Sequence, residues 1–199
     1  MRAQFDMALD AMHATFAAVP ALREFSPLPA GSRFVERLPK AVPVVPQFER
    51  CTLTPVPEAD ALFRAARALA PHVQWYQGYT EEKAGRDFAR NAGYFELLGV
   101  DGHFNAPGLS AFLLYLGPNL HYRRHWHEAE ELYYIIAGEA YFQVDGEETP
   151  SLLRPGDSRF HASFQPHQTM TGPQGILCLV LWRGAGLNGP LEMETAPGA

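Results

Sequence analysis

The segment His125–Gly138 reads HWHEAEELYYIIAG, and it decides how the rest of the chain is interpreted. Side chains on a β-strand alternate between two faces, so His125 and His127 are predicted to point the same way. After a turn near 128–130, the return strand places Glu131 where it can meet the two histidines. Two imidazoles and a carboxylate are common metal ligands and leave coordination positions open for substrate or water. The segment therefore predicts a metal site between paired strands.

A fourth ligand is expected from a later strand, where two histidines are candidates. Alternation between strand faces does not separate His161 from His167. We favour His167, because a proline precedes it and the apolar segment 175–183 follows it. His161 stays open as the alternative ligand and is otherwise expected to be structural. The ligand types suit one divalent ion but do not identify it among zinc, iron, manganese, cobalt and nickel.

After Gly93 the sequence has the pattern of an all-β fold. Runs of β-branched, aromatic and leucine residues alternate with turn residues. We expect strands at about 94–100, 109–116, 119–127, 130–137, 139–145, 149–153, 158–163, 167–171 and 175–183. Antiparallel strands of this number and spacing close best as a barrel or double-sheet jelly roll. The predicted fold class is mainly β, with a barrel over 93–199.

The N-terminal region, 1–92, is predicted to be mostly helical and packed on the barrel. Apolar side chains recur at helical spacing over Ala3–Ala18 and Glu58–Ala70. A third helix is expected to begin after Thr80, its N-cap, and to end at about Asn91. The proline-rich segment 26–57 is expected to be irregular, with one edge strand near 42–45.

Composition excludes several classes of protein. The 199 residues, 47% of them hydrophobic, fit one globular domain or one with an added terminal element. A net charge of −6 without a long basic run argues against a nucleic-acid partner. The first twenty residues do not form a signal peptide, because their apolar stretch is interrupted by Asp6, Asp10 and His13. No apolar run approaches membrane-spanning length. We therefore expect no membrane association and a cytoplasmic location. The chain has only two cysteines, Cys51 and Cys178, which indicates that it has no disulfide framework. The sequence does not fix the oligomeric state, and a homodimer stays possible.

The metal segment resembles the first motif of the cupin superfamily, HxH-x3-E-x6-G. The residues that match it are His125, His127, Glu131 and Gly138. The second cupin motif is matched more loosely, by the turn 153–157 and by His167, eleven residues after Gly156. The resemblance implies a C-terminal cupin β-barrel, also called a double-stranded β-helix or jelly roll.

A narrower resemblance is to the cupin-type dimethylsulfoniopropionate lyases, the DddQ type in particular. It is carried by Tyr122, His125, His127, Glu131, Tyr133, His167 and Trp182. That family also has a helical N-terminal region before its barrel. The resemblance implies a carbon–sulfur lyase of sulfur metabolism that cleaves dimethylsulfoniopropionate to acrylate and dimethyl sulfide. It also implies that one divalent metal ion is held by His125, His127, Glu131 and His167.

The resemblance assigns the aromatic residues to the reaction and to substrate binding. Tyr133 matches the proposed base, while Tyr122 and Trp182 match substrate-contacting positions. A tyrosine has an ordinary pKa near 10, so it needs a neighbouring cation to serve as a phenolate at neutral pH. Tyr122 is the second candidate for this role. Aromatic faces attract a sulfonium by roughly 0.5–2 kcal/mol each, and Phe112 or Tyr141 could add to this attraction.

The position of Tyr122 requires a departure from regular strand geometry. On an ideal strand its side chain would point away from that of His125, three positions later. We therefore expect a bulge or bend at 123–124 if Tyr122 is to approach the metal site.

Two other functions stay open, because one fold hosts many chemistries. One is a cupin dioxygenase or isomerase that acts on another small carboxylate with iron or manganese at the same ligands. The other is a non-enzymatic, metal-dependent small-molecule-binding protein. Tyr133 and Tyr122 beside the ligands favour the lyase, because elimination requires a base whereas a binding protein does not.

Overall fold

The computed structural model describes residues 1–29 and 31–194, in which the helices precede the long strands. The helices are α1 (Arg2–Ala18), α2 (Pro20–Phe25), α3 (Val45–Arg50), α4 (Asp60–Leu69), α5 (Glu81–Ala84) and α6 (Arg86–Asn91), with 3-10 turns η1 (Pro57–Ala59) and η2 (Ala70–His72). The strands are β1 (Arg33–Phe34), β2 (Ala92–Gly99), β3 (Phe104–Asn105), β4 (Leu109–Leu116), β5 (His121–Trp126), β6 (Glu130–Val144), β7 (Ser151–Leu153), β8 (Ser158–His161), β9 (His167–Arg183) and β10 (Glu192–Met193). The mainly β fold class with an N-terminal helical region is confirmed.

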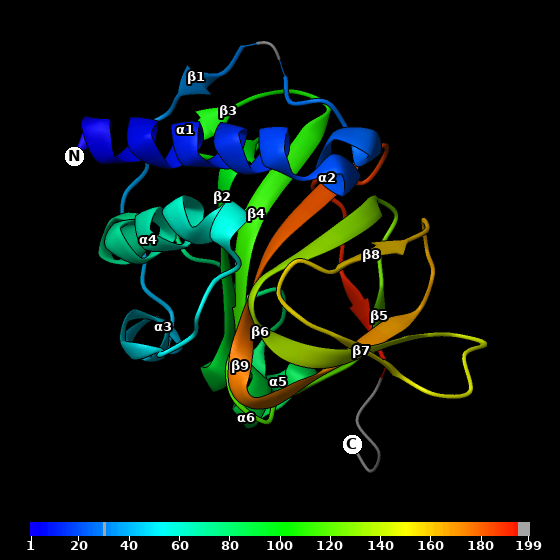
Figure 1. Ribbon diagram of the computed structural model, residues 1–199. Coiled ribbons are helices and arrows are strands. Elements are labelled where there is room, and N and C mark those ends of the chain that lie inside the picture. Colours follow the sequence, from blue (N-terminus) through cyan, green and yellow to red (C-terminus); the bar gives the residue numbers. More distant parts are fainter. Residues whose placement is uncertain (30, 195–199) are drawn as a thin grey trace.

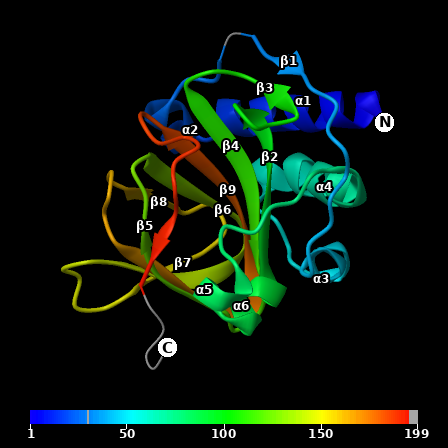
Figure 2. The same cartoon turned by 180° about the vertical axis from the view of Figure 1, so that it is seen from behind.

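Strand β9 is the centre of the barrel. It pairs antiparallel with β4, β5 and β6, and β6 in turn pairs with β7 and β8. The edge strand β10 pairs with β5 and follows the loop that returns across the barrel (Figure 2). This arrangement brings the ends of β5, β6 and β9 together inside the barrel.

Two pairs of predicted strands are continuous in the structure. The predicted strands 130–137 and 139–145 form β6, and those at 167–171 and 175–183 form β9. The chain bends without breaking because Gly138 and Gly175 both have positive φ, and a Cβ on Gly138 would lie 2.0 Å from the carbonyl oxygen of Gly175. The breaks expected between these strands, at 138 and at 172–174, are therefore bends within long strands.

Strand β4 and the long apolar parts of β6 and β9 are buried on both faces. Their outward side chains, such as Leu113 and Ile136, pack with Met12 of α1 and Leu62 of α4 in one core. Their inward side chains, such as Val180, form a second core inside the barrel. Figure 1 shows α1, α3 and α4 covering the outer face, which explains why the strands read as continuous apolar runs.

The N-terminal segment differs from expectation in two places. The expected strand near 42–45 is wrong, because Val45 begins α3 with a proline in its first turn, a position that suits this residue. The expected helix 80–91 is broken into α5 and α6 at Gly85, which has a φ of 87°. Thr80 is confirmed as the N-cap of α5, since its hydroxyl accepts from the backbone N–H of Lys83.

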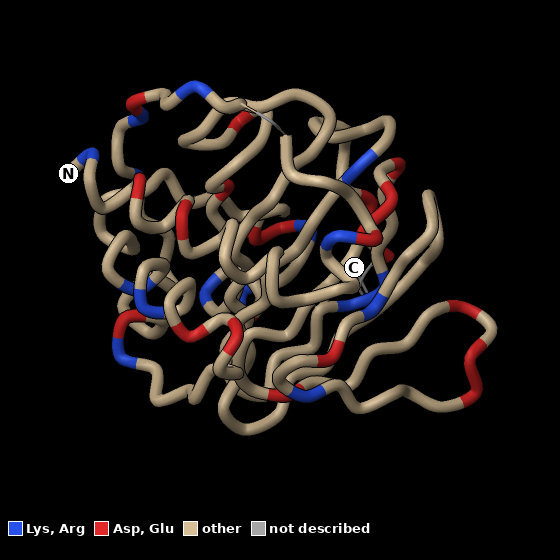
Figure 3. Tube along the Cα trace, turned by 45° about the horizontal axis from the view of Figure 1, so that its top comes forward, with Lys and Arg blue, Asp and Glu red and all other residues tan. Residues whose placement is uncertain are grey.

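Figure 3 shows Lys and Arg interspersed with Asp and Glu along the chain. Among the described residues, the helices lack the combination of length and apolar character that a bilayer span requires.

Candidate metal centre and active site

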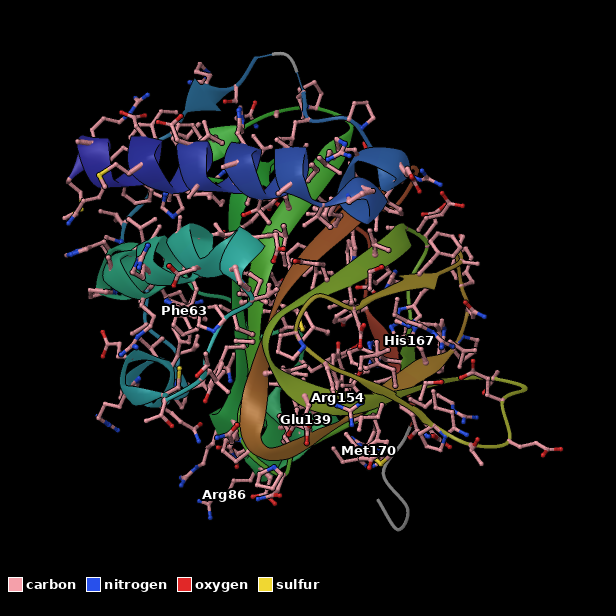
Figure 4. All side chains as sticks on the ribbon, viewed as in Figure 1. Phe63, Arg86, Glu139, Arg154, His167 and Met170 are labelled. Atoms are coloured by element: carbon pink, nitrogen blue, oxygen red, sulfur yellow. The ribbon has the colours of Figure 1, made fainter. Side chains whose placement is uncertain are left out.

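The four predicted metal ligands come together at the ends of three strands. His125 lies in β5 opposite His167, which begins β9, and Glu131 lies at the start of β6. His127 immediately follows β5. The side chains of all four residues are buried. Figure 4 shows His167 on the barrel side of the molecule, away from the helices α1, α3 and α4.

Three of the four form a compact group. In the described part of the chain, the candidate ligand atoms of His127, Glu131 and His167 all lie within 4.8 Å of one another. The Oε2 atom of Glu131 is 3.4 Å from Nε2 of His127 and 3.2 Å from Nε2 of His167. Both Nε2 atoms are buried without a hydrogen-bond partner. Such unsatisfied nitrogens facing a carboxylate are the arrangement that a bound cation would complete.

The other ring nitrogen of each predicted ligand histidine is already engaged. The Nδ1 atoms of His125, His127 and His167 donate to the backbone carbonyls of Arg123, Ala129 and Gln165, at 2.9, 2.9 and 2.8 Å. This bond fixes the tautomer that leaves Nε2 with a free lone pair, as is usual for metal-binding histidines. The sequence does not predict these bonds, because they depend on the local backbone path.

His125 lies beside this group rather than within it. Its ring stacks on Tyr122, with centroids 3.7 Å apart and an angle of 5°, and contacts the ring of His167 at 4.1 Å. Burial holds the pKa of His125 well below its ordinary value, so its imidazole is neutral. A neutral imidazole is the form that binds a metal.

His161, the alternative ligand, contacts the carboxylate instead. Its Nδ1 donates to Oε2 of Glu131 at 2.9 Å, and its ring stacks on His167 at 3.9 Å. Burial lowers the pKa of His161 to about 4. The contact follows from strand register, because His161 in β8 lies directly opposite Glu131 in β6.

Trp182 holds the second oxygen of the same carboxylate. Its indole Nε1 donates to Oε1 of Glu131 at 2.7 Å, and the two residues lie opposite each other on β9 and β6. The histidines hold the pKa of Glu131 well below its ordinary value in spite of burial, which raises it. Sequence analysis predicted Trp182 as a substrate contact and missed this orienting bond.

Both predicted tyrosines face the site. The register between β5 and β9 shifts between Tyr122 and His125, which confirms the expected irregularity at 123–124 and lets the two rings stack. Tyr133 lies two residues after Glu131 on the same strand face and is almost fully buried. Burial raises the pKa of both phenols well above its ordinary value, so a nearby cation would be needed to ionise either.

A cavity of about 240 Å³ opens beside Glu131. Its polar and aromatic lining includes Tyr94, Glu96, Phe112, Tyr122, Tyr133 and Trp182. Phe112 therefore joins the expected aromatic surface, whereas Tyr141 is 46% exposed and lies outside this lining, contrary to expectation. The register shift between Ile135 and Ala137 changes which positions of β6 face inward, so Ala140 and Phe142 point into the barrel and Tyr141 points outward. Sequence analysis also missed Tyr94 and Glu96, although a glutamate in an apolar strand is a recognisable signal.

Most of the chain is similar to proteins of one known enzyme family. Residues 18–178 match the family model for dimethylsulfoniopropionate (DMSP) lyase. The DMSP lyase DddQ of Ruegeria pomeroyi is 36% identical over 196 residues, which cover 97% of this chain and 92% of that protein. A crystal structure of DddQ from Ruegeria pomeroyi DSS-3 matches with a TM-score of 0.93 and 33% identity over 100% of both chains.

A second structural match agrees with the first. A chain from the crystal structures of the DMSP lyases RdDddP and RnDddQII has a TM-score of 0.92 and 38% identity. The match covers 98% of this chain and 99% of that chain. The likeness thus extends over the helical region as well as the barrel.

Proposed function

The chain belongs to the DMSP lyase family, and from this premise we propose which of its residues carry out the reaction. It is a metal-dependent carbon–sulfur lyase that cleaves DMSP to acrylate and dimethyl sulfide. The observation that carries the site assignment is the buried His127–Glu131–His167 group at the wall of an aromatic cavity. This membership favours the lyase over the dioxygenase, isomerase and binding-protein alternatives.

The donor set fits one divalent metal ion. The unpaired Nε2 atoms of His127 and His167 and the Glu131 carboxylate would hold it, with His125 as the fourth ligand. Imidazole and carboxylate ligands suit zinc, iron, manganese, cobalt or nickel. When bound, such an ion withdraws charge from the substrate carboxylate and stabilises the negative charge that develops on the adjacent carbon.

Tyr133 is the proposed base. This assignment is supported by the position of Tyr133, which lines the cavity and lies two residues after Glu131 on the same strand. The phenol oxygen takes a proton from the carbon next to the substrate carboxylate, and the electron pair of that C–H bond forms the double bond of acrylate. The C–S bond breaks, and its electron pair leaves with neutral dimethyl sulfide. Tyr122, whose hydroxyl lies 3.5 Å from that of Tyr79, is the second candidate for the base.

Tyr122 and Trp182 are the proposed substrate contacts. Both line the cavity, and the Trp182 ring lies 5.4 Å from Phe112 at an angle of 85°. Aromatic faces of this kind attract an onium group without hydrogen bonds. The cytoplasmic location and the possible homodimer stay predictions.

The test is the stoichiometry of the products formed by purified, metal-loaded protein supplied with DMSP. We expect equal amounts of dimethyl sulfide in the headspace and acrylate in solution. Glu131→Gln should lower the rate by at least about 10²-fold, because it removes a charged ligand. The matched control is Glu139→Gln, an exposed glutamate on the same strand, which should keep the parental rate. Equal activity of the two variants would contradict the site assignment.

A further inference from the structure

The cavity contains an acidic side chain that the reaction leaves without a role. Glu96 of β2 is only 7% exposed, yet it lines the cavity. Its Oε1 atom has no hydrogen-bond partner, and neither does the nearby buried hydroxyl of Ser110. Within residues 1–29 and 31–194, Glu96 forms no salt bridge. The carboxyl group has Ser110 and the backbone of Asp101 beside it but, among the described residues, no cationic partner. Burial of such a group is costly, so a cationic ligand in the cavity would stabilise its charged form.

The backbone is shaped to hold this carboxyl group. Gly99 has a φ of 148°, and a Cβ there would lie 1.8 Å from Oε1 of Glu96. The pairing of β2 with β4 also shifts register between Glu96 and Leu98. The bulge and the missing side chain together leave room for the carboxyl group against the backbone.

Glu96 faces the same side of the sheet as the proposed base. It lies opposite Phe112 on β4, Phe112 lies opposite Val180 on β9, and Val180 lies opposite Tyr133 on β6. The rings of Tyr94 and Phe112 are 5.2 Å apart, and Phe112 also contacts Trp182. The cavity therefore has the ligand group and base at one end, Glu96 at the other, and aromatic rings between them.

We propose that Glu96 is the counter-ion that recognises the dimethylsulfonium group of the substrate. This inference rests on the proposed function, which directs the substrate carboxylate to the ligand group. Two methylenes separate that carboxylate from the sulfonium, so the positive end extends over the aromatic rings toward Glu96. A sulfonium has no N–H or O–H group and cannot donate a hydrogen bond. A protein can therefore recognise it only through an opposite charge and through aromatic faces.

The role is one of specificity rather than of proton transfer. The sulfonium loses its charge as the C–S bond breaks, so its attraction to Glu96 is stronger in the bound substrate than in the transition state. Loss of the carboxylate charge should therefore raise KM more than it lowers kcat. A neutral group in place of the sulfonium would leave Glu96 buried and unpaired, so neutral analogues should be rejected.

The test uses two probes of the same shape and different charge. Both keep the carboxylate: 3-(trimethylammonio)propionate has a cationic head and is called the cation below, and 4,4-dimethylpentanoate has a neutral tert-butyl head. Calorimetry on metal-loaded protein should run at pH 8, above the pKa of about 7 to which burial raises Glu96. In the parent, we expect the cation to bind about tenfold more tightly or better. In Glu96→Gln, which keeps the size and removes the charge, the preference should shrink to within about threefold.

A matched control separates Glu96 from the overall charge of the protein. Glu139 is an exposed glutamate of β6 outside the lining of the cavity. Glu139→Gln should keep the parental preference for the cation. Glu96→Asp, which retains a carboxylate, should keep a preference above that of Glu96→Gln if the charge is what matters.

The outcomes distinguish this inference from the lyase assignment. A parent that binds both probes equally, or a Glu96→Gln protein that retains the parental preference with normal metal content, overturns the role of Glu96. A parent that prefers the cation but releases no dimethyl sulfide from DMSP overturns the lyase assignment and leaves Glu96 as an onium-binding residue. Release of dimethyl sulfide with equal probe binding overturns only the role of Glu96.

Discussion

At the scale of single residues, one carboxylate organises the site. Glu131 accepts from Trp182 through Oε1 and from His161 through Oε2, and Oε2 also faces the Nε2 atoms of His127 and His167. The spacing of the histidines and the glutamate is enough to predict a metal site from the sequence, because strand alternation is local. The contacts of Trp182 and His161 could not be predicted in the same way, since they depend on which strands lie beside β6.

The base assignment predicts a specific effect of a single oxygen atom. Tyr133→Phe keeps the ring that packs at 5.3 Å from Phe142 and removes the hydroxyl. We expect metal content and folding to survive and turnover to fall by about 10²-fold or more. The rate of dimethyl sulfide release checks this, with Tyr122→Phe as the comparison. A near-parental rate in Tyr133→Phe and a loss in Tyr122→Phe would transfer the role to Tyr122.

The ligand assignment predicts an order among the histidines. Alanine at His127 or His125, or in place of Glu131, should reduce the bound metal strongly, because each change removes a proposed ligand. His167→Ala should reduce it more than His161→Ala, since His167 belongs to the compact ligand group and its Nε2 lies 3.2 Å from Oε2 of Glu131, whereas His161 lies outside that group. Elemental analysis of the purified variants measures the metal content. A greater loss in His161→Ala would make His161 the fourth ligand.

At the scale of elements, the long strands β6 and β9 position the site by bending. Their apolar runs were predictable as strands, but their continuity was not, because glycine at 138 and 175 reads equally well as a turn or as a bend within a strand. The same ambiguity affects Gly85, where a predicted helix is broken in two. The pairing of distant strands and the packing of helices decide whether a glycine ends an element or bends it. The local sequence does not show these contacts.

The bend at Gly138 predicts an unequal cost for two similar substitutions. Gly138→Ala should destabilise the fold by about 3 kcal/mol or more, because positive φ and the clash with Gly175 act together. Gly146→Ala should cost only about 1 kcal/mol, since Gly146 also has positive φ but has nothing within 4 Å of an added Cβ. Urea unfolding of both variants measures the difference. Equal losses would show that the close approach at Gly138 is relieved elsewhere.

At the scale of the whole molecule, the helical layer and the barrel share a core. Phe5 of α1 lies 4.6 Å from the ring of His103, which belongs to the loop between β2 and β3. Helical periodicity predicted α1 and α4, and the N-terminal region was expected to pack on the barrel, yet the sequence could not show which strands their apolar faces would cover. The packing of one region on the other depends on side chains far apart in the sequence, such as Met12 and Leu113.

This interface predicts a loss of stability in acid. Burial lowers the pKa of His103 from 6.5 to about 4, so between these values the unfolded chain binds more protons than the folded chain. The contribution is complete above about pH 6.5 and is lost as the pH falls toward 4, on the order of 2–3 kcal/mol. Urea unfolding at pH 7 and pH 4.5 should show a smaller loss in His103→Gln than in the parent.

The control for this prediction is His13, which is exposed on α1. His13→Gln should lose as much stability between pH 7 and pH 4.5 as the parent does. If His103→Gln and His13→Gln behave alike, protonation of His103 does not account for the sensitivity to acid.

The central claim is that one metal ion, held by the buried group around Glu131, makes the chain a DMSP lyase. The most direct test is the rate of dimethyl sulfide release from metal-free protein as a divalent ion is added back in steps. The account predicts a rate that rises in proportion to the added metal and levels off at about one ion per chain. A rate independent of added metal, or one that rises only beyond several ions per chain, would contradict it.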